Sequence, residues 1–299
     1  MIVKKVFQKS PFRGIHGHMV KAQNEIKDSL KLIDIVVEVL DARIPFSSQN
    51  PIINNITSDK ARIIVLNKAD LADKNVTEEW KKYFMSKGMV CLDTDTSDNN
   101  CIKKIVEAIK VKGKEVYLEK NKQKLQKVQI KPIYRVLIIG IPNVGKSTLI
   151  NKIAKKNSAA IGNKPGVTKK KQWIRVSNNI DLLDTPGLLW PKLDDKNVGA
   201  KLALTGNIKQ EVLDVEELAC VGIDMLVLNS KYKKMLQEKY KLEDEDFELI
   251  SYDILEKIGR KRGCVISGGN IDMTKAALCF LEDLKSGKIG NISLDLPNV

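Results

Sequence analysis

The feature that most constrains the fold is the segment Gly140–Ser147, which reads Gly-Ile-Pro-Asn-Val-Gly-Lys-Ser and has the spacing of a phosphate-binding loop. The apolar run Val136–Ile139 before it predicts a buried strand, and the residues from Thr148 onward predict the opening of a helix. Such a loop binds phosphate because backbone NH groups and the positive end of the helix face the ligand. We therefore expect an α/β fold with a nucleotide at the carboxyl end of this strand.

The rest of the chain also has an α/β pattern. Short apolar runs followed by turn residues predict further strands over 33–40, 62–66, 89–92 and 180–183. Strand signals fade after about residue 205, where the spacing of apolar residues becomes helical. We expect a Rossmann-like, mostly parallel sheet in a first domain over 1–205, a smaller all-helical domain over 206–285, and a tail over 286–299.

Composition narrows the class of protein. The chain has 299 residues, of which 43% are hydrophobic, so it can bury a substantial core. No apolar run approaches the roughly 18 residues of a membrane span, and the polar start over 1–13 lacks the apolar stretch of a secretory signal. Five scattered cysteines without a Cys-x-x-Cys pair argue against a zinc site or a disulfide framework. We expect a cytoplasmic protein with reduced cysteines.

The charge balance points to a polyanionic partner. The sequence has 51 Lys and Arg against 37 Asp and Glu, a net charge of +14. An excess of this size beside a phosphate loop favours RNA as a partner, and Arg260-Lys261-Arg262 is the cluster most suited to RNA phosphates. A proteome that is rich in lysine would produce the same balance without any such partner.

The phosphate loop has residues for both phosphate and metal. Lys146 is expected to bridge the β and γ phosphates, and the Ser147 hydroxyl to hold Mg²⁺. The remaining nucleotide contacts from this loop and the following helix are expected from Asn143, Val144, Gly145 and Thr148.

A second motif, Asp184-Thr185-Pro186-Gly187, follows the strand expected over 180–183. The Asp184 carboxylate can hold Mg²⁺ through water, and the Gly187 NH can contact the γ phosphate. Between this motif and the phosphate loop lies Thr168, which is placed to close over the metal when triphosphate is bound. The assignment of Thr168 rests on its position alone.

A third motif selects the base. In Asn67-Lys68-Ala69-Asp70, the Asp70 carboxylate can accept hydrogen bonds from the ring NH and the amino group of guanine, which adenine cannot supply. The Asn67 side chain would tie this segment to the phosphate loop, and the Lys68 stem would cover the base. Asp95 and Thr96, after the strand expected over 89–92, match the position of a loop whose backbone NH contacts the guanine oxygen. The expected ligands are GTP and GDP.

The order of these motifs identifies a family. The guanine motif precedes the phosphate loop, which reverses the order of an ordinary GTPase, so the chain resembles the circularly permuted GTPases of ribosome assembly and most closely their ribosome biogenesis GTPase A branch. That resemblance implies a GTP-hydrolysing factor for late assembly of the large (50S) subunit. The factor would bind the subunit precursor and its rRNA in the GTP state, leave after hydrolysis, and be monomeric off the ribosome. The resemblance also uses residues 17–22, 41–45, 190–192, 261–264 and 267–269.

Two further roles follow from the resemblance. Many GTPases place a water-orienting glutamine after the Gly187 position, but this chain has Leu188, which cannot form a hydrogen bond with water. The resemblance makes His18 the candidate for positioning the water, although a histidine near an N-terminus is more often a surface residue. It also makes Asn143 a candidate potassium ligand, the alternative being that Asn143 only shapes the loop. If hydrolysis is incidental, the chain is instead a GTP-dependent RNA-binding module.

Overall fold

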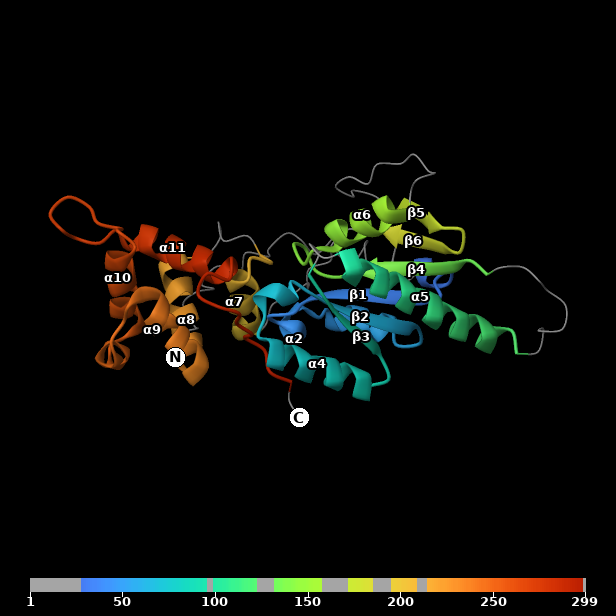
Figure 1. Ribbon diagram of the computed structural model, residues 1–299, viewed down its shortest axis with the longest axis horizontal. Helices are drawn as coiled ribbons and strands as arrows, with labels where there is room; N and C mark the ends of the chain where they lie inside the picture. Colours follow the sequence, from blue (N-terminus) through green and yellow to red (C-terminus); the bar gives the residue numbers. More distant parts are fainter. Residues whose placement is uncertain are drawn as a thin grey trace.

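The computed structural model describes residues 28–95, 99–122, 132–157, 172–184, 195–208 and 214–297. In these residues a six-stranded sheet lies at one end of an elongated molecule and a group of helices at the other (Figure 1). The strand order is β3-β2-β1-β4-β6-β5, and every neighbouring pair is parallel except β5 with β6. This confirms the Rossmann-like, mostly parallel α/β fold. The strands are β1 Ile35–Asp41, β2 Ala61–Asn67, β3 Val90–Thr94, β4 Tyr134–Ile139, β5 Gln172–Ser177 and β6 Ile180–Asp184.

Strand β1 is central, and its burial explains its sequence. It pairs with β2 on one side and β4 on the other, and all seven of its residues are buried. A strand covered on both faces reads as a continuous apolar run rather than an alternation of apolar and polar residues. Strand β5 was not predicted, because it is an edge strand in which exposed Trp173 and Arg175 alternate with more buried residues.

Helices cover both faces of the sheet. Ile35, Val37 and Val39 of β1 pack in one core with α5 and α6, whereas Val36 and Leu40 face the side of α3 and α4. This division follows from the two-residue period of a strand. The helices of this part are α2 Pro45–Ser48, α3 Pro51–Ile56, α4 Lys74–Ser86, α5 Asn99–Lys120 and α6 Lys146–Asn157, with the 3-10 helix η2 Ala69–Leu71.

The second part of the described chain is helical and has its own core. Aspartate or asparagine caps begin several of its helices, because their side chains accept hydrogen bonds from the first free backbone NH groups. Leu218, Leu255 and Phe280 are fully buried between the helices. The helices are α7 Lys196–Leu204, α8 Val215–Val227, α9 Ser230–Tyr240, α10 Ser251–Lys261 and α11 Met273–Lys285, with the 3-10 helix η4 Asp244–Glu248.

Helix α7 belongs to both cores. Its Val198 and Leu202 pack in the core of the sheet, whereas Ala203 and Leu204 pack among the helices. The boundary expected at residue 205 therefore falls at the end of a helix that connects the two parts, rather than in a loose linker.

Residues 286–297, set apart as a tail by their polar composition, lie in the junction between the two parts. Ile289 and Ile292 are buried in the helical core. The Asp295 carboxylate accepts hydrogen bonds from the Ser47 NH (2.6 Å) and hydroxyl (3.0 Å) and from Lys201 (2.7 Å). These buried contacts make the segment a structural part of the interface. None of the helices in the described ranges is long and apolar enough to span a membrane.

Candidate guanine nucleotide site

The predicted motifs meet at the carboxyl edge of the sheet. The ends of β1 and β2 lie side by side, with Asp41 opposite Asn67, and Asn67 is in turn opposite Thr94 of β3. The phosphate loop leaves the end of β4, and β6 ends at Asp184 on the far side of β4. Parallel pairing therefore brings together segments that are up to 143 residues apart in the chain, from Asp41 to Asp184. His18, Thr96, Thr168 and Gly187, as well as the side chain of Asp184, lie outside the described residues.

Two glycines allow the phosphate loop to adopt its path. A Cβ atom added to Gly140 would lie 2.5 Å from the carbonyl oxygen of Val39, and one added to Gly145 would lie 2.1 Å from Nδ2 of Asn67. Both glycines have positive φ angles, of 153° and 103°. A side chain at either position would therefore clash and also strain the backbone. The loop is a narrow cradle of the kind that brings backbone NH groups close to a phosphate.

The helix that follows presents polar groups at its first turn. Helix α6 begins at Lys146, and the side chains of Ser147 and Thr148 are exposed there. Lys146 is 7% exposed, and its Nζ donates a hydrogen bond to the Ile141 carbonyl at 3.2 Å. The Lys146 side chain is thus folded back over its own loop. Its ammonium group can form an ion pair there with an anionic ligand. Asn143 has a left-handed backbone with φ 58° and an exposed side chain.

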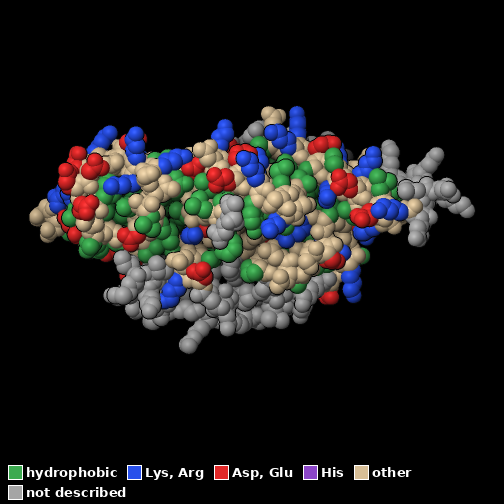
Figure 2. Space-filling view, turned by 90° about the horizontal axis from the view of Figure 1, so that it is seen from below, with side chains coloured by type: hydrophobic (Ala, Val, Ile, Leu, Met, Phe, Trp, Pro, Cys, Tyr) green, Lys and Arg blue, Asp and Glu red, His purple; other side chains and the backbone are tan. Residues whose placement is uncertain are grey.

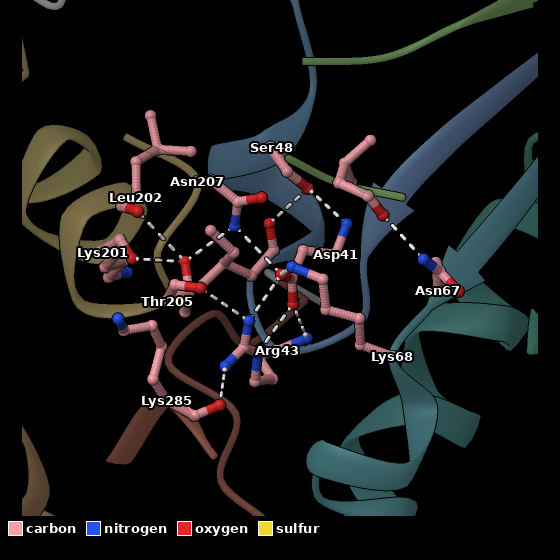
Figure 3. Close-up of polar contacts among 12 residues, drawn as sticks. Asp41, Arg43, Ser48, Asn67, Lys68, Lys201, Leu202, Thr205, Asn207 and Lys285 are labelled. Carbon is pink, nitrogen blue, oxygen red and sulfur yellow. Dashed lines mark hydrogen bonds and ion pairs between the residues drawn. The ribbon is translucent and has the colours of Figure 1, made fainter. Parts of the chain in front are cut away.

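The guanine loop, residues 67–71, is tied directly to the phosphate loop. Asn67 Nδ2 donates a hydrogen bond to the Val144 carbonyl at 2.7 Å (Figure 3). The Oδ1 atom of Asn67 is buried and has no hydrogen-bond partner among the described residues. An orphaned buried acceptor is rare, and it is the kind of atom that a bound ligand satisfies. The hydrogen bond from Asn67 therefore holds the guanine loop close to the phosphate loop.

Asp70 belongs to the 3-10 helix η2 of the guanine loop. Its side chain is exposed, yet partial desolvation of the carboxyl group, followed by the charge of Asp95, raises the pKa of Asp70 above its usual value. A carboxylate with an unfavourable neighbouring charge gains from new hydrogen-bond donors. An exposed carboxylate of this kind can accept hydrogen bonds from a ligand beside the guanine loop.

The structure adds three buried residues, Asp41, Arg43 and Asn207, that were not predicted as part of the site and that gather around Lys68. We call these four residues the Asp41 cluster: Asp41, Arg43, Lys68 and Asn207 (Figure 3). The Asp41 carboxylate accepts hydrogen bonds from Arg43 Nη2 at 2.8 Å, Lys68 Nζ at 3.0 Å and Asn207 Nδ2 at 3.0 Å. Burial acts to raise the pKa of Asp41, but the charges of Arg43 and Lys68 hold it well below its usual range. The available signal was Asp-Ala-Arg at the end of a buried strand, which does not reveal that Asn207 lies beside it.

Comparisons with known proteins cover both parts of the chain. The family described as 50S ribosome-binding GTPase matches residues 135–261. Ribosome biogenesis GTPase A of Bacillus cereus is 43% identical over 282 residues, which cover 94% of this chain and 92% of that protein. Ribosome biogenesis GTPase A of Thermotoga maritima is 33% identical over 281 residues, which cover 94% and 93% of the two chains.

Solved structures give a consistent result. The GNP-bound YlqF of T. maritima aligns with a TM-score of 0.60 and 30% identity over 93% of this chain and 99% of that chain. The GDP-bound structure of TM YlqF aligns with a TM-score of 0.63 and 29% identity over 92% and 100%. The similarity therefore includes the sheet, the carboxyl edge where the motifs meet, and the helices beyond α7.

Proposed function

Because this chain belongs to the ribosome biogenesis GTPase A family, we propose that it binds GTP at the carboxyl edge of its sheet and hydrolyses it during late assembly of the large (50S) ribosomal subunit. Family membership makes the chain a GTP-binding hydrolase with a role in ribosome biogenesis. The late step, the binding of the subunit precursor and its rRNA in the GTP state, and release after hydrolysis are the proposal. The nucleotide site is supported mainly by the hydrogen bond from Asn67 to Val144, which joins the guanine and phosphate loops.

We assign the nucleotide contacts by group. The base is held by Asn67, Lys68, Asp70, Asp95 and Thr96. The phosphates are held by Asn143, Val144, Gly145, Lys146, Ser147, Thr148 and the Gly187 NH. The glycine cradle and the exposed first turn of α6 support this assignment.

Mg²⁺ is assigned to the Ser147 hydroxyl, to Thr168, and through water to Asp184. A bound Mg²⁺ would neutralise the negative charge that develops on the phosphate oxygens. The exposure of Ser147 at the helix terminus, beside the buried Lys146, fits a hydroxyl that binds a metal next to the phosphates.

RNA contact is assigned to the helical part. Arg260 and Lys261 are in the last turn of α10, and Arg262 follows directly; all three side chains are exposed. Figure 2 shows Lys and Arg side chains interspersed with Asp and Glu on one face, from the helical part to the sheet. Only 5% of the residues are aromatic, which disfavours base stacking on a single strand, so we assign the contact to the shape and backbone of a folded RNA.

The function is tested by single-turnover GTP hydrolysis with purified large-subunit precursors. We expect hydrolysis to accelerate at least about tenfold with precursors, because the chain itself lacks the water-orienting glutamine at Leu188. The GTP-loaded protein should co-sediment with the precursors and the GDP-loaded protein should not. Small subunits serve as the control. A flat rate combined with GTP-dependent binding would favour the alternative, an RNA-binding module whose hydrolysis is incidental.

The role of His18 is tested in the same assay. We expect His18→Ala to lower the stimulated rate by about 100-fold, since a positioned general base typically contributes a factor of this order. His16→Ala, two residues away, is the matched control and should leave the rate unchanged. Equal rates for both histidine variants and the wild type would exclude His18.

A role of Asn143 as a potassium ligand is tested by changing the salt. If Asn143 binds potassium, hydrolysis will be faster in potassium than in sodium at equal ionic strength. Equal rates in the two salts would exclude the cation.

A further inference from the structure

We infer that Asp41 is a positioning residue that joins the guanine loop to the helical part, so that guanine binding and the packing of α7 and α11 against the sheet influence each other. The inference rests on the proposed function, because it takes Lys68 as the residue whose stem covers the base.

On the side of the nucleotide, Asp41 fixes a side chain that would otherwise be flexible. Lys68 has a left-handed backbone, with φ 59° and ψ 37°, and its side chain is 24% exposed. A free lysine stem samples many rotamers, and its ordering is costly in entropy. The 3.0 Å ion pair with a carboxylate that is 0% exposed selects one direction for the stem. Asp41 therefore sets where the stem lies relative to the base.

On the side of the helices, Arg43 connects Asp41 to two helix ends. Arg43 Nη2 donates to the Thr205 carbonyl at 2.8 Å, and Nη1 donates to the Lys285 carbonyl at 3.2 Å. Thr205 caps α7, and Lys285 is the last residue of α11. The last carbonyls of a helix lack partners within the helix, and a cation beside them is favourable. One guanidinium group therefore holds the carboxyl ends of α7 and α11 against β1.

Because these contacts are buried, they couple the position of Lys68 to the packing of α7 and α11. Oδ1 of Asp41 accepts from the NH and Nε of Arg43, while Oδ2 accepts from Arg43 Nη2, Lys68 and Asn207. Since Asp41 is inaccessible to water, solvent cannot replace a partner that moves away. A shift of α7 or α11 therefore changes the hydrogen bonds that hold Lys68. By thermodynamic reciprocity, a ligand that fixes Lys68 also favours one packing of the helices.

A second link runs beside the first. The Ile292 NH donates to the Leu71 carbonyl at 3.1 Å, and the Leu294 NH donates to the Arg43 carbonyl at 2.8 Å. Residues 286–297 thus connect the end of the guanine loop to the same arginine. Both links join the same two parts of the molecule, so neither the guanine loop nor the helix ends can move alone.

The inference is tested by GDP binding to the full chain without ribosomes. In the wild type, we expect GDP to slow amide hydrogen exchange several-fold over 203–208 and 284–290, which are the ends of α7 and α11. Asp41→Asn should abolish this slowing and weaken GDP binding about tenfold, a usual size for coupling between sites. Glu38→Gln is the matched control, because Glu38 is also a buried, ion-paired carboxylate of β1 but has Arg62 as its partner. This control should keep the exchange response and the GDP affinity.

If Asp41→Asn does not fold, Asn207→Ala tests the same coupling. Asn207→Ala leaves the ion pairs of Asp41 in place and removes none of the assigned GTP contacts. It should weaken GDP binding in the wild-type background but not in a Lys68→Ala background, whereas a merely structural effect would be equal in both. Equal effects, or GDP binding without any change in exchange at the helix ends, would overturn the inference while leaving the proposed function standing. Failure of the wild type to bind GDP would overturn both.

Discussion

Lys146→Ala is expected to weaken GTP binding by about 100-fold and to abolish measurable hydrolysis. Lys146 is 7% exposed, and its Nζ lies 3.2 Å from a carbonyl of the loop that would surround the phosphates. Removing charge-assisted hydrogen bonds to two phosphates costs about 3 kcal/mol, which corresponds to that factor. Isothermal titration with GDP and with a non-hydrolysable GTP analogue measures the loss, which should be larger for the triphosphate.

Lys152→Ala is the matched control, because it removes a lysine from the same helix at a position outside the loop. It should bind both nucleotides like the wild type. Thermal melting of both variants checks that the sheet is intact. GTP binding and hydrolysis by Lys146→Ala at wild-type levels would show that the phosphates lie elsewhere.

Asp70→Asn is expected to weaken GDP binding by about 100-fold and to create affinity for xanthosine diphosphate. The carboxylate can accept two hydrogen bonds from guanine, and their loss costs about 3 kcal/mol. An amide at this position can instead donate to the additional carbonyl of xanthine, so the preference between the two bases should reverse. Competition binding with the two diphosphates gives the ratio directly. Asp59→Asn, an exposed acid near the opposite edge of the sheet, should change neither affinity.

The pH dependence of GDP affinity shows whether Asp70 binds guanine as an ionised carboxylate or as a neutral hydrogen-bonding group. Desolvation and then the charge of Asp95 raise the pKa of Asp70, so the free folded protein holds this proton more tightly than the unfolded chain does. Stability from Asp70 is therefore present at low pH and lost as the pH rises through its folded pKa. Guanine needs the ionised form, so GDP affinity should fall as the pH is lowered from neutral through the raised pKa of Asp70. Asp70→Asn should flatten that part of the profile; an identical slope in the variant would assign the titration to another group.

Most of the sheet and the two nucleotide loops could be predicted from local patterns. A strand such as β1 is buried on both faces, so its apolar run is conspicuous, and the glycine spacing of 140–147 reflects backbone requirements seen at Gly140 and Gly145. Strand β5 was missed because an alternating edge strand directly after a basic run resembles a loop. Its place in the sheet depends on pairing with β6, which a local pattern does not contain.

The Asp41 cluster could not be predicted, for a similar reason. Asp41 and Asn207 are 166 positions apart, and neither has a local pattern that points to the other. The polar composition of residues 286–297 was equally uninformative, because the burial of Ser293 and Asp295 depends on partners from both parts of the molecule. Local sequence predicts elements well where their own backbone requires certain residues, and poorly where distant surfaces meet.

The position of residues 286–297 also has a consequence for the order of folding during translation. This segment contacts Ser47, Leu71, Trp80 and Lys201, all of which the ribosome synthesises earlier. The sheet and the helices each have an apolar core, so each part can begin to fold as it emerges. The junction can close only after this segment has followed. A newly made chain can therefore fold its nucleotide loops before they are connected through this segment to the helices.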